Sequence, residues 1–219
     1  MRFQDRSDAG RQLAAQLSLF ANHPDIRVLA LPRGGVPIAF EIARELRAPL
    51  DVWVVRKLGT PRIPELAVGA IGPGGIQVID PSVAQAMHMS PELIAEIAAR
   101  ERLELDRREA AYRPNRPPID VRGKTAILVD DGLATGSTMR AAVAALRRLE
   151  PARIIVAVPV AAESVCARLA LEADQVVCLF APIDLDSVGQ WYDDFSQTTD
   201  AEVTNLLSRA AAFTEPHPA

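Results

Sequence analysis

The sequence has few of the residues that build disulfide frameworks, metal centres and membrane spans. Among its 219 residues are two cysteines and three histidines. Cys166 and Cys178 lack the spacing of a metal-ligand motif, and we expect them to be small buried residues. No apolar run approaches the length of about 20 residues that crosses a bilayer, and residues 1–6 lack the apolar core of a signal peptide. These absences predict a cytoplasmic, reducing location and no membrane partner.

The sequence also has no excess of basic residues. The chain has 28 acidic and 24 basic residues and a net charge of −4 at pH 7, which argues against a general nucleic-acid binder because such proteins carry a basic surface. Its 49% hydrophobic and 24% charged residues are typical of a soluble globular protein. A chain of this length buries a substantial core. We therefore expect one domain over residues 1–219 with an appendage.

The residues that best indicate a ligand-binding site lie in the segment 126–138, AILVDDGLATGST. The apolar run at 127–129 predicts a buried strand, and residues 139–149 predict a helix. The loop between them is suited to an anion, because N–H groups at the start of a helix have no acceptor within it. Its glycines let the backbone curl around a phosphate, and it adds the hydroxyl donors of Thr135, Ser137 and Thr138.

Two carboxylates, Asp130 and Asp131, end this predicted strand. Their charge is wrong for binding phosphate, but their oxygens suit a sugar diol or a hydrated Mg²⁺ ion. A plain strand-to-helix turn with an N-capping hydroxyl explains a serine or threonine alone. It does not explain two carboxylates at the end of a buried strand, where unpaired charge is costly.

A second strand–loop–helix unit comes earlier in the chain. Residues 26–31 predict a strand, residues 32–37 a loop and residues 38–47 a helix. Arg33 gives this loop a fixed positive charge, and Gly34 and Gly35 allow the backbone to approach a ligand closely, although a glycine pair after a strand is more often only a tight turn.

The next predicted strand, residues 50–55, is followed by two cations, Arg56 and Lys57, in the segment 56–59. Alternation along the strand directs them to opposite faces, and we favour Lys57 as the cation nearer the anion site. A solvated charge pair at a strand end is the plainer alternative.

The run LVDDGLATGST, residues 128–138, resembles the phosphoribosyl pyrophosphate (PRPP) signature of the type I phosphoribosyltransferases. The resemblance implies that Asp130 and Asp131 bind the ribose hydroxyls and Mg²⁺. It implies that the loop holds the 5-phosphate through Leu133, Ala134, Thr135, Gly136, Ser137 and Thr138. Residues 31–35 look like the family's pyrophosphate loop, which assigns the leaving group to Arg33, Gly34, Gly35 and Lys57.

The implied reaction is Mg²⁺-dependent transfer of the phosphoribosyl group from PRPP to a nitrogenous acceptor, with Asp130, Asp131, Lys57 and Arg33 as the catalytic residues. The family's oxopurine enzymes usually carry an aspartate at the position of Ala134, so hypoxanthine or guanine salvage is not expected. A PRPP-sensing regulatory protein on the same fold is the alternative. A hydrolase of another α/β family is a third possibility, but no histidine or cysteine lies near these loops in the sequence. Family analogy also suggests a homodimer.

Strands alternating with helices predict an α/β fold, a doubly wound and mostly parallel sheet with right-handed crossovers. Additional strands are expected at residues 154–160 and 175–180, with a helix at 163–173 between them, and terminal helices at 7–22 and 200–213.

Residues 57–118 form an insertion in this pattern. It contains a loop carrying Arg62 and Glu65, a hairpin whose strands are 66–71 and 76–79, a short helix at 81–89, and a long helix that begins after Ser90 and runs to Tyr112. The resemblance implies that the hairpin is a mobile arm that covers the active site.

Residues 181–219 are expected to form a small hood and a frayed tail. Three of the ten aromatic residues of the chain, Trp191, Tyr192 and Phe195, fall within five positions here. They have two equally weighted roles: stacking on the heterocycle of an acceptor, or packing one helical turn onto the sheet.

Overall fold

The computed structural model describes residues 2–61, 63, 66–114 and 117–214. Its centre is a sheet of five parallel strands in the order β2-β1-β6-β7-β8. The strands are β1 (Ile26–Ala30), β2 (Leu50–Val52), β6 (Thr125–Val129), β7 (Arg153–Val160) and β8 (Gln175–Phe180). The expected α/β fold with a mostly parallel sheet is confirmed. The aspartate pair follows β6, the middle strand, and so lies at the centre of the carboxyl edge, where ligands bind in such sheets.

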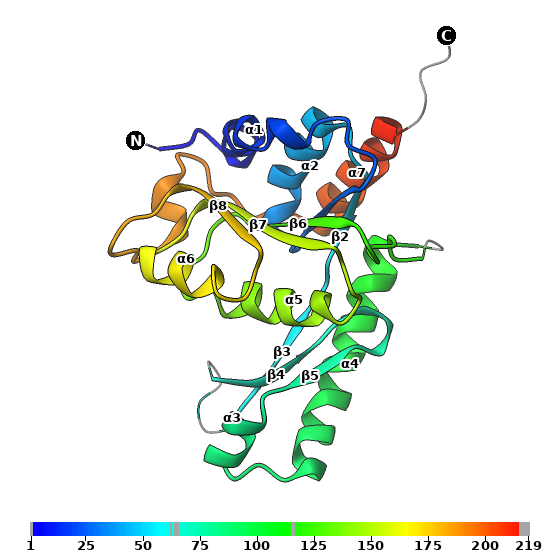
Figure 1. Cartoon of the computed structure of the whole chain (residues 1–219), viewed down its shortest axis with the longest axis vertical. Coiled ribbons are helices and arrows are strands. Elements are labelled where there is room, and N and C mark those ends of the chain that lie inside the picture. Colours follow the sequence, from blue (N-terminus) through cyan, green and yellow to red (C-terminus); the bar gives the residue numbers. More distant parts are fainter. Residues whose placement is uncertain (1, 62, 64–65, 115–116, 215–219) are drawn as a thin grey trace.

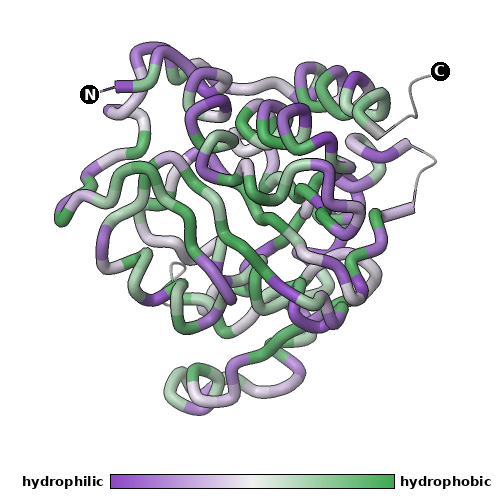
Figure 2. The backbone as a smooth tube through the Cα atoms, turned by 45° about the horizontal axis from the view of Figure 1, so that its top comes forward, coloured by the Kyte–Doolittle hydropathy of each residue, from purple (hydrophilic) through white to green (hydrophobic). Residues whose placement is uncertain are grey.

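Helices cover both faces of this sheet (Figure 1). One face carries α1 (Arg6–Gln16), α2 (Gly35–Leu46) and α7 (Asp200–Ala210), and the other carries α5 (Ser137–Arg147) and α6 (Glu163–Leu169). Two clusters of buried apolar side chains lie between these layers. Burial on both faces explains why the strands are continuous apolar runs, and Figure 2 shows the hydrophobic colour concentrated on them.

The insertion forms a second, antiparallel sheet and two helices beside the core (Figure 1). Its strands are β3 (Arg56–Gly59), β4 (Ala67–Ile71) and β5 (Gln77–Ile79), and its helices are α3 (Pro81–Ala86) and α4 (Pro91–Tyr112). The hairpin and the long helix are therefore confirmed. Ser90 caps α4 by accepting the N–H of Leu93, and Pro91 occupies the first turn, where no N–H is needed. We call β3, β4 and β5 the arm.

The largest boundary error of the sequence analysis lies between β2 and the arm. Residues 50–55 were expected to be one strand followed by the segment 56–59, but β2 ends at Val52 and Arg56–Gly59 is the first strand of the arm. Trp53 donates its N–H to Ala30 before the chain leaves the parallel sheet. A continuous apolar run does not reveal a change of sheet, since both sheets bury their apolar residues.

Several helix boundaries also differ from expectation. Helices α2 and α5 begin earlier than predicted, at Gly35 and Ser137. For α2 the reason is that Pro37 is tolerated in a first turn. Helices α1, α6 and α7 end earlier, and short 3₁₀ turns at Ser18–Phe20 and Ala211–Thr214 follow α1 and α7.

The structure bears on the expectations about the two cysteines and about membrane-spanning helices. Cys166 on α6 and Cys178 on β8 are free thiols that are half-buried, whereas full burial was expected. Burial raises the pKa of the Cys178 thiol to about 12. Among the described helices, none combines the length and the hydropathy that crossing a bilayer requires.

Candidate active site

Asp130 is a partly buried carboxyl group at the end of β6. Its Oδ1 accepts the N–H of Asp131 at 2.9 Å, and its Oδ2 has no hydrogen-bond partner among the described residues. Burial and the neighbouring Asp131 raise the pKa of Asp130 well above its usual value. A carboxyl group in this state gains a favourable interaction when a cation or hydroxyl donors arrive. The position therefore suits a ligand that brings either.

Asp131 is held from two directions. Its Oδ2 accepts hydrogen bonds from Arg6 at 2.9 Å (Nε) and 2.8 Å (Nη2), and its backbone carbonyl accepts the hydroxyl of Tyr192 at 2.6 Å. Burial raises the pKa of Asp131, while Arg6 opposes that shift. The two aspartates are adjacent in sequence but have different surroundings: Asp131 is tied to a guanidinium, and Asp130 is not.

The loop after the aspartates leads into the start of α5. The N–H of Leu133 donates to Val160 on β7 and its side chain is buried, so the accessible donors come from the residues after it. Gly136, the residue before α5, has a φ of +70°, and a Cβ there would lie 2.5 Å from Val165 on α6. Glycine is required at this position on both grounds. Having no side chain, it offers no cap to the first N–H groups of α5, of which that of Ser137 donates to Thr135 Oγ1 at 3.4 Å.

Hydroxyl groups surround these N–H groups. Thr135 and Thr138 are exposed, and Thr135 Oγ1 lies 3.1 Å from Ser137 Oγ. The loop with Ala134 therefore presents backbone and hydroxyl donors to one point in front of a helix start, as an anion site requires.

The loop after β1 lies against the acidic pair. Arg33 pairs with Asp200, the first residue of α7, at 3.6 Å, and the peptide bond between Pro32 and Arg33 is cis. A methyl group on Gly34 would overlap Asp131 Oδ2, and one on Gly35 would lie 2.5 Å from the carbonyl oxygen of Val129. From the sequence alone, these glycines are expected to let the backbone approach a ligand. The structure gives a further reason, which is that the end of β6 packs against them.

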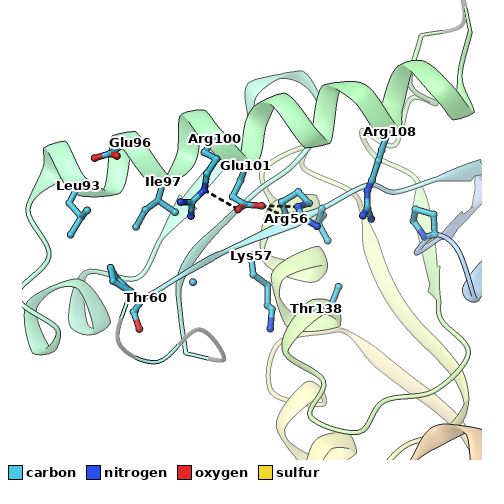
Figure 3. A pocket seen from close by; sticks show the side chains of 14 residues that line it. Arg56, Lys57, Thr60, Leu93, Glu96, Ile97, Arg100, Glu101, Arg108 and Thr138 are labelled. Carbon is cyan, nitrogen blue, oxygen red and sulfur yellow. Dashed lines mark hydrogen bonds and ion pairs between the residues drawn. The ribbon is translucent and has the colours of Figure 1, made fainter.

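Lys57 lies on β3 and points away from Arg56, to the side of β3 on which Thr138 lies (Figure 3). Arg56 turns to α4, where its Nε and Nη2 donate to Glu101 Oε2 at 2.9 and 2.6 Å. The expected alternation of the two cations is therefore seen. Between the arm and α4 is a cavity of about 760 Å³, which also reaches Pro32 and Thr138 and has Arg100 and Arg108 on its wall.

The aromatic residues of the hood pack mainly against the protein. Trp191 stacks on Phe180 with ring centroids 5.5 Å apart, and Tyr192 is buried 5.3 Å from Phe3. Phe195 lies under the guanidinium of Arg6, 4.0 Å from its ring centroid. Of the two expected roles, packing describes Trp191 and Tyr192, although the segment is a 3₁₀ turn, Val188–Trp191, and not an α-helical turn. Contact with an acceptor stays a prediction.

Sequence reasoning missed Arg6, which donates to Asp131, and Asp200, which pairs with Arg33. No sequence signal could have found either contact, because Arg6 precedes its partner by 125 positions and carries no motif. The structure brings together the residues around Asp130, Asp131 and the loops after β1 and β6. The predicted arm residues Arg62 and Glu65 lie outside the described residues.

The donor set can be compared with the needs of Mg²⁺. Within the described ranges, no group of three or more His, Cys, Asp or Glu side chains is placed to hold a metal. Mg²⁺ is commonly bound by one or two carboxylates together with substrate phosphates and water. Asp130, whose Oδ2 has no hydrogen-bond partner in the described structure, fits this mode of binding.

Comparisons with known proteins identify the family of the chain. The family model "Phosphoribosyl transferase domain" matches residues 3–180. A protein of Mycobacterium tuberculosis (strain ATCC 25618 / H37Rv), named "Putative phosphoribosyl transferase Rv0571c", is 46% identical over 208 residues. The match covers 95% of this chain and 47% of that protein, so the chain spans about half of its relative's length.

Solved structures agree at the level of the fold. The crystal structure of TT1426 from Thermus thermophilus superposes with a TM-score of 0.88 at 42% identity, covering 95% of this chain and 99% of that one. The AQ2163 protein of Aquifex aeolicus, at 12% identity, shares the fold with a TM-score of 0.51 over 84% of this chain and 78% of its own. The extent of the family match, together with the acidic pair and loop that follow β6, shows that this chain belongs to the phosphoribosyl transferase domain family.

Proposed function

We propose that the chain is a Mg²⁺-dependent phosphoribosyltransferase that transfers the 5-phosphoribosyl group from PRPP to a nitrogenous acceptor and releases pyrophosphate. The observation that carries this proposal is the convergence of three features at one edge of the sheet. These are the acidic pair after β6, the start of α5, which follows a glycine without a side chain, and the loop of Arg33, Gly34 and Gly35 packed against that pair. The acceptor is expected to be a small heterocycle, and the protein a homodimer by family analogy.

In this proposal the ends of PRPP are held by different elements. The N–H groups and hydroxyls of Ala134, Thr135, Gly136, Ser137 and Thr138 bind the 5-phosphate. The N–H of Leu133 is engaged by Val160, so Leu133 contributes by shaping the loop. Asp130 accepts hydrogen bonds from the ribose hydroxyls, which replace the water it loses by burial.

The reaction breaks the bond between ribose C1 and the pyrophosphate oxygen, and the pyrophosphate leaves with the electron pair. A nitrogen of the acceptor then forms the new bond to C1, and the proton that this nitrogen carried is lost to water. Arg33 and Lys57 stabilise the negative charge of the leaving group, which is the larger part of what the protein contributes in such a transfer. Arg33 exchanges its ion pair with Asp200 for the phosphate oxygens. The arm reduces access of water to the activated sugar.

Mg²⁺, when bound, would neutralise charge on the pyrophosphate. Asp130 is the residue best placed to hold it, directly or through water, because its Oδ2 has no hydrogen-bond partner among the described residues. Asp131 has one oxygen already engaged by Arg6, so its other oxygen is assigned to a ribose hydroxyl.

The hydrolase alternative would need a positioned nucleophile or a base for water, and among the described residues no histidine or cysteine lies on the loops after β1 and β6. His23 lies in the turn before β1, at the opposite edge of the sheet, and His88 follows α3 in the insertion. His217 lies outside the described residues. Both cysteines lie on α6 and β8, and their thiol pKa values are raised by burial, which makes them poor nucleophiles at neutral pH.

The test is calorimetric titration of PRPP in the presence of Mg²⁺ into wild type and Asp130→Asn. Asp106→Asn is the matched control, because it makes the same change in charge on an exposed part of α4. We expect the Asp130 variant to bind at least tenfold more weakly and the control to bind as wild type. Pyrophosphate release is then screened with a panel of nitrogen heterocycles. Binding without release for any acceptor would favour the PRPP sensor, and no binding by wild type would refute the proposal.

A further inference from the structure

Arg6 is the first residue of α1 and reaches the acidic end of β6 from the opposite end of the sequence. The helix start is fixed by Asp5, whose Oδ1 accepts the N–H of Asp8 at 2.7 Å. Helix α1 packs along α2, the helix that follows Gly34. This packing sets the distance over which the Arg6 side chain extends to the carboxylate of Asp131, and both side chains are largely buried, with 11% and 16% exposed.

The Arg6 guanidinium has partners along its edge and over one face. Its Nε and Nη2 donate to Asp131 Oδ2, and its Nη1 donates to the carbonyl of Ser196 at 2.7 Å. Its plane lies over the ring of Phe195. Tyr192, from the same hood segment, donates its hydroxyl to the backbone of Asp131. Arg6 and residues 192–196 therefore form a clamp that fixes both the side chain and the main chain of Asp131.

The clamp has a geometric consequence for ligand binding. Asp131 Oδ2 is engaged by two N–H groups and lies against Gly34, so only Oδ1 remains for a ligand. A carboxylate fixed in this way is preorganised, and a ligand hydroxyl that meets it does not have to order it. Asp130 lacks such a clamp, since its described partner is the backbone N–H of Asp131.

We propose that Arg6 is a positioning residue for ribose recognition, which orients Asp131 Oδ1 toward a sugar hydroxyl without touching the ligand itself. The proposal rests on the proposed function, because it names how one residue of that site is aligned. It also gives Tyr192 and Phe195 a role in supporting Asp131, where the sequence suggested contact with the acceptor base.

A plain structural ion pair is the competing explanation, since breaking a buried pair destabilises a fold whatever its function. The two explanations differ in which ligand is affected. Positioning of a ribose-binding oxygen affects ligands that contain the sugar and leaves pyrophosphate alone unaffected. General destabilisation lowers the melting temperature and affects both ligands, or neither.

The experiment compares Arg6→Gln and Arg6→Lys with Arg11→Gln, a control on the same helix whose exposed side chain pairs with the partly buried Asp8. Calorimetry measures the Kd of PRPP and of inorganic pyrophosphate, each with Mg²⁺. We expect Arg6→Gln to weaken PRPP binding by about 10- to 100-fold, the usual effect of removing a partner that orients a ligating group. Arg6→Lys keeps the positive charge but loses the paired donors of the guanidinium, so we expect it to weaken PRPP binding less than Arg6→Gln does. Pyrophosphate binding and the control stay as in wild type.

A double-mutant cycle guards against misfolding as the cause. In an Asp131→Asn background, Arg6→Gln has no carboxylate to orient, so the further loss of PRPP affinity is expected to be less than twofold. Equal losses in both backgrounds, or equal weakening of PRPP and pyrophosphate by Arg6→Gln, would overturn the inference. Failure of the wild-type protein to bind PRPP would instead overturn the proposed function, so the two failures are distinguishable.

Discussion

Replacing Gly34 with alanine tests how tightly the loop after β1 is fitted to the acidic pair. The backbone at Gly34 has φ −60° and ψ −33°, which any residue adopts, so the substitution introduces no backbone strain. The new methyl group would overlap Asp131 Oδ2, which is held in place by Arg6. To fit alanine, the carboxylate has to move and break its pair with Arg6. Breaking a buried pair costs about 3–5 kcal/mol, and the residual exposure of this pair places the cost at about 2–4 kcal/mol.

For a chain of this length each kcal/mol lowers the melting temperature by about 2–4 °C. We therefore expect Gly34→Ala to melt about 4–16 °C below wild type in a thermal scan followed by circular dichroism. Gly123→Ala is the control, because Gly123 has a φ of +65° but open space around its Cβ position, and its cost of about 1–2 kcal/mol is backbone strain alone. Adding Asp131→Ala should make Gly34→Ala nearly neutral. A Gly34→Ala protein that melts within 1 °C of wild type would refute the reasoning.

Three further predictions concern other groups. Burial raises the pKa of Tyr112 to about 12 and that of Tyr192 higher still. Since these are the only two tyrosines in the sequence, the near-ultraviolet tyrosinate signal should be absent at pH 10.5, where free tyrosine is more than half ionised. The free energy of unfolding should fall as pH rises from about 10 toward 12, because the tyrosines of the unfolded state ionise first. Lys57→Ala is expected to weaken PRPP binding about tenfold. Arg56→Ala breaks the partly exposed pair with Glu101, and it should cost about 1 kcal/mol of stability and leave the affinity for PRPP unchanged. Gly136→Ala is expected to lower both stability, by about 2 kcal/mol, and PRPP affinity, measured by denaturant titration and calorimetry.

The parts of the fold that sequence could predict are those encoded locally. The run before Asp130 is apolar because β6 is buried on both faces, and the helix after Ser90 has its cap and its first-turn proline within four residues. Each feature depends on neighbours in the chain. The acidic pair is recognisable for the same reason, since its apolar strand, its loop and its helix start are consecutive.

The parts that sequence could not predict depend on distant partners. The local sequence around Arg56 fits a solvated strand end as well as it fits the first strand of the arm, because the two differ only in the pairing with β4. The role of Arg6 depends on the packing of α1 against α2. Tyr192 carries an aromatic ring and a hydroxyl that suit stacking on a base equally well, and only the fold directs that hydroxyl to the carbonyl of Asp131.

The hydrogen bond between Arg6 and Ser196 has a consequence for how the protein reaches its native state. It joins residues 190 positions apart, and contacts across such separations form late because the entropy of closing a long loop opposes them. The parallel sheet can assemble from β1, β6 and β7 before this contact exists. Refolding followed by sheet formation should therefore run ahead of refolding followed by recovery of ligand binding, with the ribose site maturing in the last kinetic phase.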